Sequence, residues 1–130
     1  MRGLRFMKEK FDSFCSALEK LKEALALEPV GITLDGSLQR FEFTYELAWK
    51  VLKIVLFKKG IECNSPRDCF EGAFQNGIIE DEQIWLSMIK DRNFSSHTYS
   101  EDQAKQIYDR VKKDYFPAFF ALKSKLNAFI

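Results

Sequence analysis

The sequence predicts an all-α fold, an antiparallel four-helix-type up-and-down bundle with one additional short helix. Apolar side chains recur every three or four residues through most of the 130 residues, which is the spacing of one helix face. No stretch alternates apolar and polar residues over a useful length, as a half-buried strand would. Residues that start and stop helices separate the apolar stretches. At this length we expect one domain, residues 1–130, with a core that needs no metal ion or disulfide.

The first helix is expected from about Leu4 to about Leu27, because Pro29 and Gly31 then end it. Lysines and glutamates fill the face opposite its apolar stripe. The stripe consists of Leu4, Met7, Phe11, Phe14, Leu18, Leu21 and Leu25.

The second helix is expected to begin at a cap formed by Asp35 or Ser37 and to run to about Lys59, where Gly60 is a natural stop. Phe43 and Phe57, together with Trp49, widen its apolar surface beyond one stripe. A helix that is apolar on more than one side occupies the centre of a bundle, a subunit interface, or both. The core stripe consists of Leu38, Phe41, Tyr45, Ala48, Leu52, Val55 and Leu56.

A short third helix should begin at Ser65, with Pro66 in the first helical position, and close at Asn76-Gly77. A fourth should begin near Glu80-Asp81 and lead directly into Arg92. Its inner face consists of Ile84, Trp85, Met88 and Ile89.

The last helix should begin at Ser100, because Gln103 three positions later completes a capping box. Pro117 lies inside the helical pattern, and we expect a kink there because proline removes a backbone donor. The stripe consists of Ala104, Ile107, Tyr108, Val111, Tyr115, Phe119, Leu122 and Leu126.

The formal net charge of +1 argues against a general polyanion-binding protein but allows a small local anion site. The start of the chain lacks the apolar core of a signal peptide, and no run is long enough to cross a membrane. Three cysteines without C-x-x-C spacing indicate reduced thiols, and we expect a cytoplasmic location. With one histidine we expect no metal site, and we expect no cofactor.

The candidate functional segment runs from Asp91 to Tyr99 and contains His97, the only histidine. An unperturbed pKa of about 6.5 lets His97 exchange protons near neutral pH. Arg92 carries a permanent charge that suits phosphate, and Asn93 lies four positions before His97. RNA cleavage without metal needs two proton transfers and positive charge at the phosphate. Two copies brought together by a two-fold axis would supply two histidines for the proton transfers and two arginines for the phosphate.

The same residues also allow a structural interpretation. A histidine at a helix end often serves as a cap, and Arg92 could pair with Asp91 or Glu101. On the second helix, Glu46 and Lys50 are four apart and form a favourable helical pair. On spacing alone, that pair indicates a solvated helix face.

Arg92, His97 and Tyr99 form the pattern Arg-x4-His-x-Tyr. Further signature stretches are Arg40 to Lys50 on the second helix, Pro66-Arg67, Ala73-Phe74 with Gly77-Ile78, Trp85, and Asp91 to Asn93. Together these stretches resemble the HEPN superfamily (higher eukaryotes and prokaryotes nucleotide-binding). More narrowly, the chain resembles the bacterial nucleotidyltransferase substrate-binding protein family, and the likeness covers essentially the whole chain.

The resemblance implies a bundle that forms a homodimer and works with a minimal nucleotidyltransferase encoded nearby. In one view of the family the bundle is a metal-independent ribonuclease toxin. Arg92 and His97 would then be catalytic, Asn93 would assist them, and the partner would silence the site by attaching adenylate to Tyr99. In the other view it is a non-catalytic subunit that binds a nucleotide or another substrate for the nucleotidyltransferase. The stretch from Arg40 to Lys50 and the Arg92–Tyr99 segment occur together in the family. Glu46 and Lys50 are therefore expected to support that segment. A purely structural interaction bundle is the third alternative.

Overall fold

The structure, a computed structural model, describes residues 2–95 and 100–129 and confirms the all-α bundle. The elements are α1 (Arg2–Leu25), α2 (Ile32–Lys58), α3 (Pro66–Gln75), α4 (Glu82–Ser95), α5 (Glu101–Arg110), the π-helical turn η1 (Val111–Tyr115) and α6 (Phe116–Asn127). Since α5, η1 and α6 follow one another without a break, the described chain forms four long or medium helical rods and one short one. None of the helices in these two ranges is long and apolar enough to cross a membrane.

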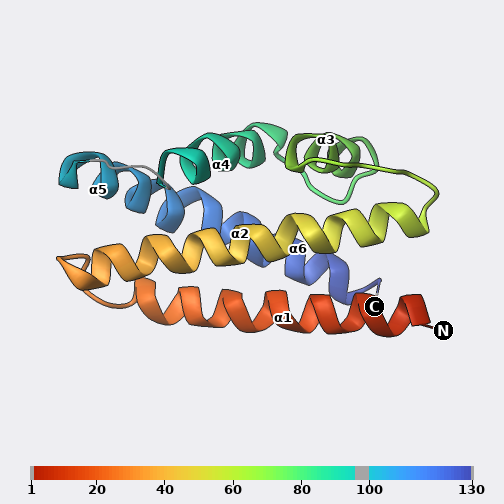
Figure 1. Cartoon of the computed structure of the whole chain (residues 1–130), viewed down its shortest axis with the longest axis horizontal. Helices are drawn as coiled ribbons and strands as arrows, with labels where there is room; N and C mark the ends of the chain where they lie inside the picture. The colour runs from red at the N-terminus through yellow and green to blue at the C-terminus, as the bar shows by residue number, and fades with distance from the viewer. Residues whose placement is uncertain (1, 96–99, 130) are drawn as a thin grey trace.

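Helix α2 occupies the centre of the bundle (Figure 1). It runs antiparallel to α1, while α3 and α4 lie along its other side. The continuous α5–η1–α6 rod passes along α2 and ends against α1, which brings both chain ends to the same end of the bundle. The predicted central position of α2 is therefore confirmed. Of the residues that widen its apolar surface, Phe43 and Phe57 are 61% and 66% exposed.

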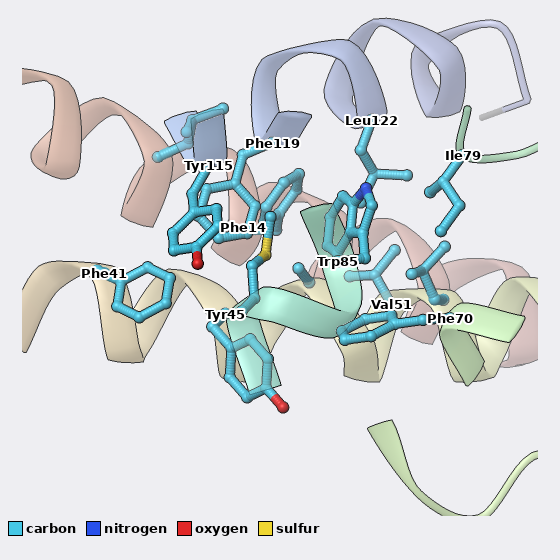
Figure 2. Close-up of a cluster of buried hydrophobic side chains, with 14 of the residues drawn as sticks. Phe14, Phe41, Tyr45, Val51, Phe70, Ile79, Trp85, Tyr115, Phe119 and Leu122 are labelled. Atoms are coloured by element: carbon cyan, nitrogen blue, oxygen red, sulfur yellow. The ribbon is translucent and has the colours of Figure 1, made fainter. Parts of the chain in front are cut away.

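An aromatic cluster holds the rods together (Figure 2). Phe41 of α2 stacks on Tyr115 of η1 at 5.3 Å between ring centroids. Trp85 of α4 contacts Phe70 of α3 at 5.0 Å and Phe119 of α6 at 5.6 Å. These rings are almost fully buried, so the cluster fixes α4 against both α3 and the last rod. Aromatic pairs at such separations contribute beyond the area that they bury.

Two of the predicted helix starts are confirmed in atomic detail. The Ser65 hydroxyl accepts a hydrogen bond from the backbone N–H of Asp68 at 3.1 Å. The Ser100 hydroxyl accepts from the Gln103 N–H at 3.2 Å, and the Gln103 side chain accepts from the Ser100 N–H at 3.0 Å. This reciprocal capping box starts α5 immediately after the candidate segment.

The predicted start of α2 was wrong. The helix begins at Ile32, before Asp35 and Ser37, and no side chain caps it. Gly31, with φ of 53°, makes the tight entry that residues with a Cβ adopt only at a cost. The Ser37 hydroxyl instead donates to the Thr33 carbonyl oxygen at 2.8 Å inside the helix.

The predicted apolar stripes of the second and last helices are buried throughout, as is that of the first helix apart from Leu4, which is 54% exposed. The kink expected at Pro117 takes a different form. One turn earlier, η1 widens the helix, and the Phe116 N–H donates to the Val111 carbonyl oxygen. A widened turn relieves the clash between a proline ring and the carbonyl one turn before it.

The expectation of three reduced thiols was also wrong, because Cys63 and Cys69 form a disulfide. Cys63 lies in the α2–α3 loop and Cys69 in the first turns of α3. The loop folds back on the helix and brings their Cα atoms to 5.1 Å, within the usual range for a disulfide. The remaining thiol, Cys15, is half-buried, and burial raises its pKa.

Candidate functional site

Arg92 lies near the end of α4 and faces two glutamates of α2. Its Nη1 is 3.9 Å from Oε2 of Glu42, and its Nε is 3.6 Å from Oε1 of Glu46. Because the two glutamates are one helical turn apart, both carboxylates point from the same face of α2. The positive guanidinium between them offsets their mutual repulsion. The Arg92 side chain is 27% exposed, so its charge stays accessible to a ligand.

Glu46 is held in place by a second contact. Its Oε2 accepts a hydrogen bond from the indole Nε1–H of Trp49 at 3.1 Å. Its carboxylate therefore contacts Arg92 and Trp49, and among the residues that the structure describes it forms no ion pair with Lys50. Lys50 lies one turn further along α2, on the wall of a different groove. The structure thus brings Glu46, but not Lys50, into contact with Arg92.

A surface groove of about 660 Å³ opens beside Arg92, between α1, α2 and α4. Arg40 and Lys20 add positive charge to its walls, and the exposed ring of Phe43 adds an apolar surface. Three cations and two carboxylates thus line one open groove. Such a mixture can bind a phosphate through the cations and a base or another flat group against Phe43.

Tyr45 lies behind this groove on α2, in the buried cluster of Figure 2. Burial raises the pKa of its phenol to about 12, and the nearby negative charge of Glu46 acts in the same direction. The positive charge of Arg92 partly opposes the rise. Tyr45 is therefore a neutral packing residue at physiological pH.

A buried network fixes the turn of α4 that carries Arg92. Asp91, 5% exposed, accepts two hydrogen bonds from Arg110 of α5, at 2.7 Å from Nε and 2.9 Å from Nη2. The Tyr115 hydroxyl donates a third hydrogen bond to Asp91 Oδ2. Burial, followed by this hydrogen bond, raises the pKa of Tyr115 well above its usual range. These bonds tie the end of α4 to the helix that follows the candidate segment.

This network was missed by sequence reasoning, which considered Asp91 only as a partner for Arg92. The side chains that hold Asp91 are 19 and 24 positions away in sequence. Glu101, the other partner considered for Arg92, lies 4.0 Å from Lys105 instead. The one available signal was that Tyr115 and Asp91 both fall at inward positions of their helical patterns.

Of the other predicted site residues, the structure describes Asn93 but not His97 or Tyr99. Asn93 lies on the exposed side of the last turns of α4. His97 and Tyr99 lie outside the described residues, between the end of α4 and the start of α5. Within residues 2–95 and 100–129, no three His, Cys, Asp or Glu side chains are grouped so that they could hold a metal ion.

Comparison with known proteins places this geometry in a family. Residues 9–128 match the family described as "nucleotidyltransferase substrate binding protein like". The chain belongs to this family. The matched region includes α2, α4 and the whole candidate segment, so the resemblance noted in the sequence is confirmed.

Three relatives of this nucleotidyltransferase substrate-binding family member are informative. A Haemophilus influenzae protein named "Probable ribonuclease HepT" is 30% identical over 95 residues, which is 69% of this chain and 65% of that protein. The chain thus matches slightly less than two thirds of that relative's length. A crystal structure from Thermus thermophilus is 34% identical, with a TM-score of 0.81 over 87% of this chain and 98% of the other. A structure from H. influenzae, described as showing the fold of a substrate binding domain of a nucleotidyltransferase, is 25% identical, with a TM-score of 0.68 over 95% of this chain and 98% of the other.

Proposed function

We propose that this protein is a metal-independent endoribonuclease of the HEPN type, and that Arg92 and His97 carry the reaction. The observation that carries the proposal is the placement of Arg92. Glu42 and Glu46 orient its guanidinium at the edge of an open groove, five positions before the only histidine. The name of the matched H. influenzae relative supports the same activity.

The proposed reaction uses the 2′-hydroxyl of RNA as the nucleophile. One His97 imidazole takes the proton of that hydroxyl, and the 2′-oxygen forms a bond to phosphorus. Arg92 stabilises the negative charge that builds up on the phosphate oxygens. The bond from phosphorus to the 5′-oxygen breaks, and a protonated His97 supplies the proton to the leaving oxygen. The products are a cyclic 2′,3′-phosphate and a 5′-hydroxyl.

A homodimer completes this chemistry, because one copy has a single histidine for two proton transfers. A two-fold axis near the ends of two α4 helices would bring two Arg92 and two His97 side chains to one phosphate. Asn93 follows Arg92 directly and would orient the phosphate or the base by hydrogen bonds. Glu46 acts as a positioning residue through its contact with Arg92.

The proposed partner is a minimal nucleotidyltransferase, which would silence the ribonuclease by transferring adenylate to Tyr99. A bulky, negatively charged group two positions from His97 would repel the RNA phosphates. Mass spectrometry of the chain, coexpressed with a minimal nucleotidyltransferase from the same genome, tests this step. We expect an AMP adduct that is absent from Tyr99→Phe. An unmodified chain in the presence of active partner and ATP would contradict it.

The ribonuclease proposal is tested by RNA cleavage at neutral pH with a chelator present, after intact mass has excluded modification. We expect Arg92→Ala and His97→Ala to abolish cleavage, and Arg92→Lys to restore only a small part because lysine cannot form the forked contact. Lys113→Ala, which removes an exposed cation of η1, is the matched control and should cleave normally. Equal cleavage by Arg92→Ala and Lys113→Ala would refute the assignment.

A second candidate function is a non-catalytic subunit that binds substrate for the nucleotidyltransferase. It is favoured by the description of the family and by that of the H. influenzae structure. Arg92 would then bind a nucleotide phosphate without breaking a bond. Nucleotide binding that is lost in Arg92→Ala, with no RNA turnover by unmodified protein, would favour this candidate over the first.

A further inference from the structure

A second groove lies on the face of α2 that carries Glu46, toward the C-terminal end of that helix. Its volume is about 750 Å³, and it is formed by α2, the start of α1 and the α2–α3 loop. Ile54 and the exposed rings of Phe6 and Phe57 form its apolar walls. None of the proposed catalytic residues lies in it.

Most of the polar residues that line this groove are lysines. Lys10, Lys50, Lys53 and Lys58 line it, and Glu62 is the single acidic residue among the lining side chains. With four lysines and one glutamate, the lining of this groove carries a formal charge of +3, whereas the whole chain has a net charge of only +1. An apolar groove bordered by four lysines matches an anionic ligand with flat apolar parts.

One stripe of α2 lines both grooves. Positions 39, 43, 46, 50, 53 and 57 are spaced by four and three residues in turn, which keeps them on one helix face. None of these six residues is buried. Glu46, which contacts Arg92, and Phe57 are 11 positions apart, or roughly 16 Å along the helix. A chain-like ligand that runs from Arg92 toward the C-terminal end of α2 would pass over Lys50 and Lys53.

We propose that the groove lined by Phe6, Phe57 and the four lysines is a binding site for single-stranded RNA that flanks the scissile phosphate. The lysines contact successive phosphates, and bases stack on the exposed rings of Phe6 and Phe57. Phosphate contacts combined with aromatic stacking are the usual means of binding single strands without strong sequence preference. The choice of RNA rests on the proposed ribonuclease function, whereas the groove itself does not depend on cleavage.

The test measures the affinity of unmodified protein for a fluorescein-labelled, fully 2′-O-methylated RNA 12-mer by anisotropy, at several salt concentrations. This probe lacks the nucleophilic hydroxyl, so binding is separated from cleavage. We expect the double variant Lys53→Ala/Lys58→Ala to bind about tenfold more weakly. Its slope of log affinity against log salt should be shallower by about 1.4, since each lost phosphate contact removes about 0.7. Phe57→Ala should weaken binding roughly fivefold or more through lost stacking.

The matched control is Lys113→Ala/Lys125→Ala, which removes two exposed lysines from another groove, beside α4 and α6. It should bind the 12-mer like the wild type. Circular dichroism should show equal helicity for all variants, because the mutated side chains are exposed. Equal affinities and equal salt slopes for the two double variants would overturn the inference, even if Arg92→Ala still abolishes cleavage.

The remaining outcomes are equally distinct. Weakened 12-mer binding in Lys53→Ala/Lys58→Ala, with no cleavage of any RNA by the wild type, would support the groove and refute the ribonuclease proposal. A parallel measurement uses a labelled peptide of alternating glutamate and phenylalanine. If the double variant loses binding of this peptide but keeps its affinity for RNA, the groove is a docking site for an acidic protein segment and the inference is wrong.

Discussion

Replacing Asp91 by alanine should destabilise the protein more than any other removal of a single carboxylate in the described chain. Asp91 is 5% exposed and accepts hydrogen bonds from both Arg110 and Tyr115. Without it, the Tyr115 hydroxyl stays buried with no acceptor, which costs about 1–3 kcal/mol. Breaking a fully buried ion pair costs about 3–5 kcal/mol. The Arg110 side chain is 43% exposed, however, so water compensates much of its share.

Together these effects give a loss of about 2–4 kcal/mol in the free energy of unfolding. For a chain of this size, that corresponds to a decrease of roughly 10 °C in Tm. Urea and thermal denaturation followed by circular dichroism measure both quantities. Asp12→Ala is the matched control, because Asp12 forms an exposed ion pair with Lys8 at 3.5 Å. Such helical surface pairs contribute about 0.3–0.5 kcal/mol.

Asp91→Asn refines the test. Asparagine keeps the shape and one acceptor oxygen but removes the charge, so its loss of stability should lie between those of the other two variants. If Asp91→Ala unfolds within about 0.5 kcal/mol of Asp12→Ala, the network does not fix α4 as described. The argument that Arg92 is held at the groove by a rigid α4 terminus would then fail.

Three further predictions follow from other contacts. Glu46→Gln should lower the pKa of Tyr45 below about 12, because it removes a neighbouring negative charge. Phenolate absorbance during alkaline titration measures this pKa. If Glu62→Gln, which changes an exposed residue, shifts the pKa of Tyr45 by the same amount, the prediction is refuted. Stability should fall as pH rises above about 10, because the unfolded chain then releases phenolic protons that folded Tyr45 and Tyr115 retain; urea denaturation from pH 8 to 11 should show the loss, and a rise would reverse the argument. Protein that is unfolded without reductant should expose one reactive thiol, that of Cys15. Cys63→Ser should reduce the free energy of unfolding by about 2 kcal/mol, because the loop between the two cysteines is no longer closed in the unfolded chain. Three reactive thiols without reductant would show that no disulfide forms.

Local signals predicted most of the fold. Ser65 and Ser100 cap helices because their partners lie three positions away, and such pairs are visible in the sequence. The stripes of the second and last helices are buried as predicted because a helix face is set by spacing alone. The start of α2 was misplaced because a glycine turn, rather than a polar cap, begins it.

The contacts of the site could be predicted only in part, because they join residues that are far apart in the chain. Arg92 of α4 contacts Glu42 and Glu46 of α2. Only the family likeness led us to expect Glu46 near Arg92. Whether Arg110 and Tyr115 converge on Asp91 depends on how three helices pack. The Cys63–Cys69 disulfide depends on the path of a loop, which neither cysteine spacing nor composition specifies.

The central claim, metal-independent cleavage by Arg92 and His97, is tested most directly by the products from one defined bond. The substrate is an RNA in which a single ribose keeps its 2′-hydroxyl and all others carry 2′-O-methyl groups, incubated with unmodified protein and chelator. We predict cleavage only after that ribose, with a cyclic 2′,3′-phosphate on one product and a 5′-hydroxyl on the other, and none with Arg92→Ala or His97→Ala. Cleavage that requires added metal ion, or that continues in either variant, would contradict the account.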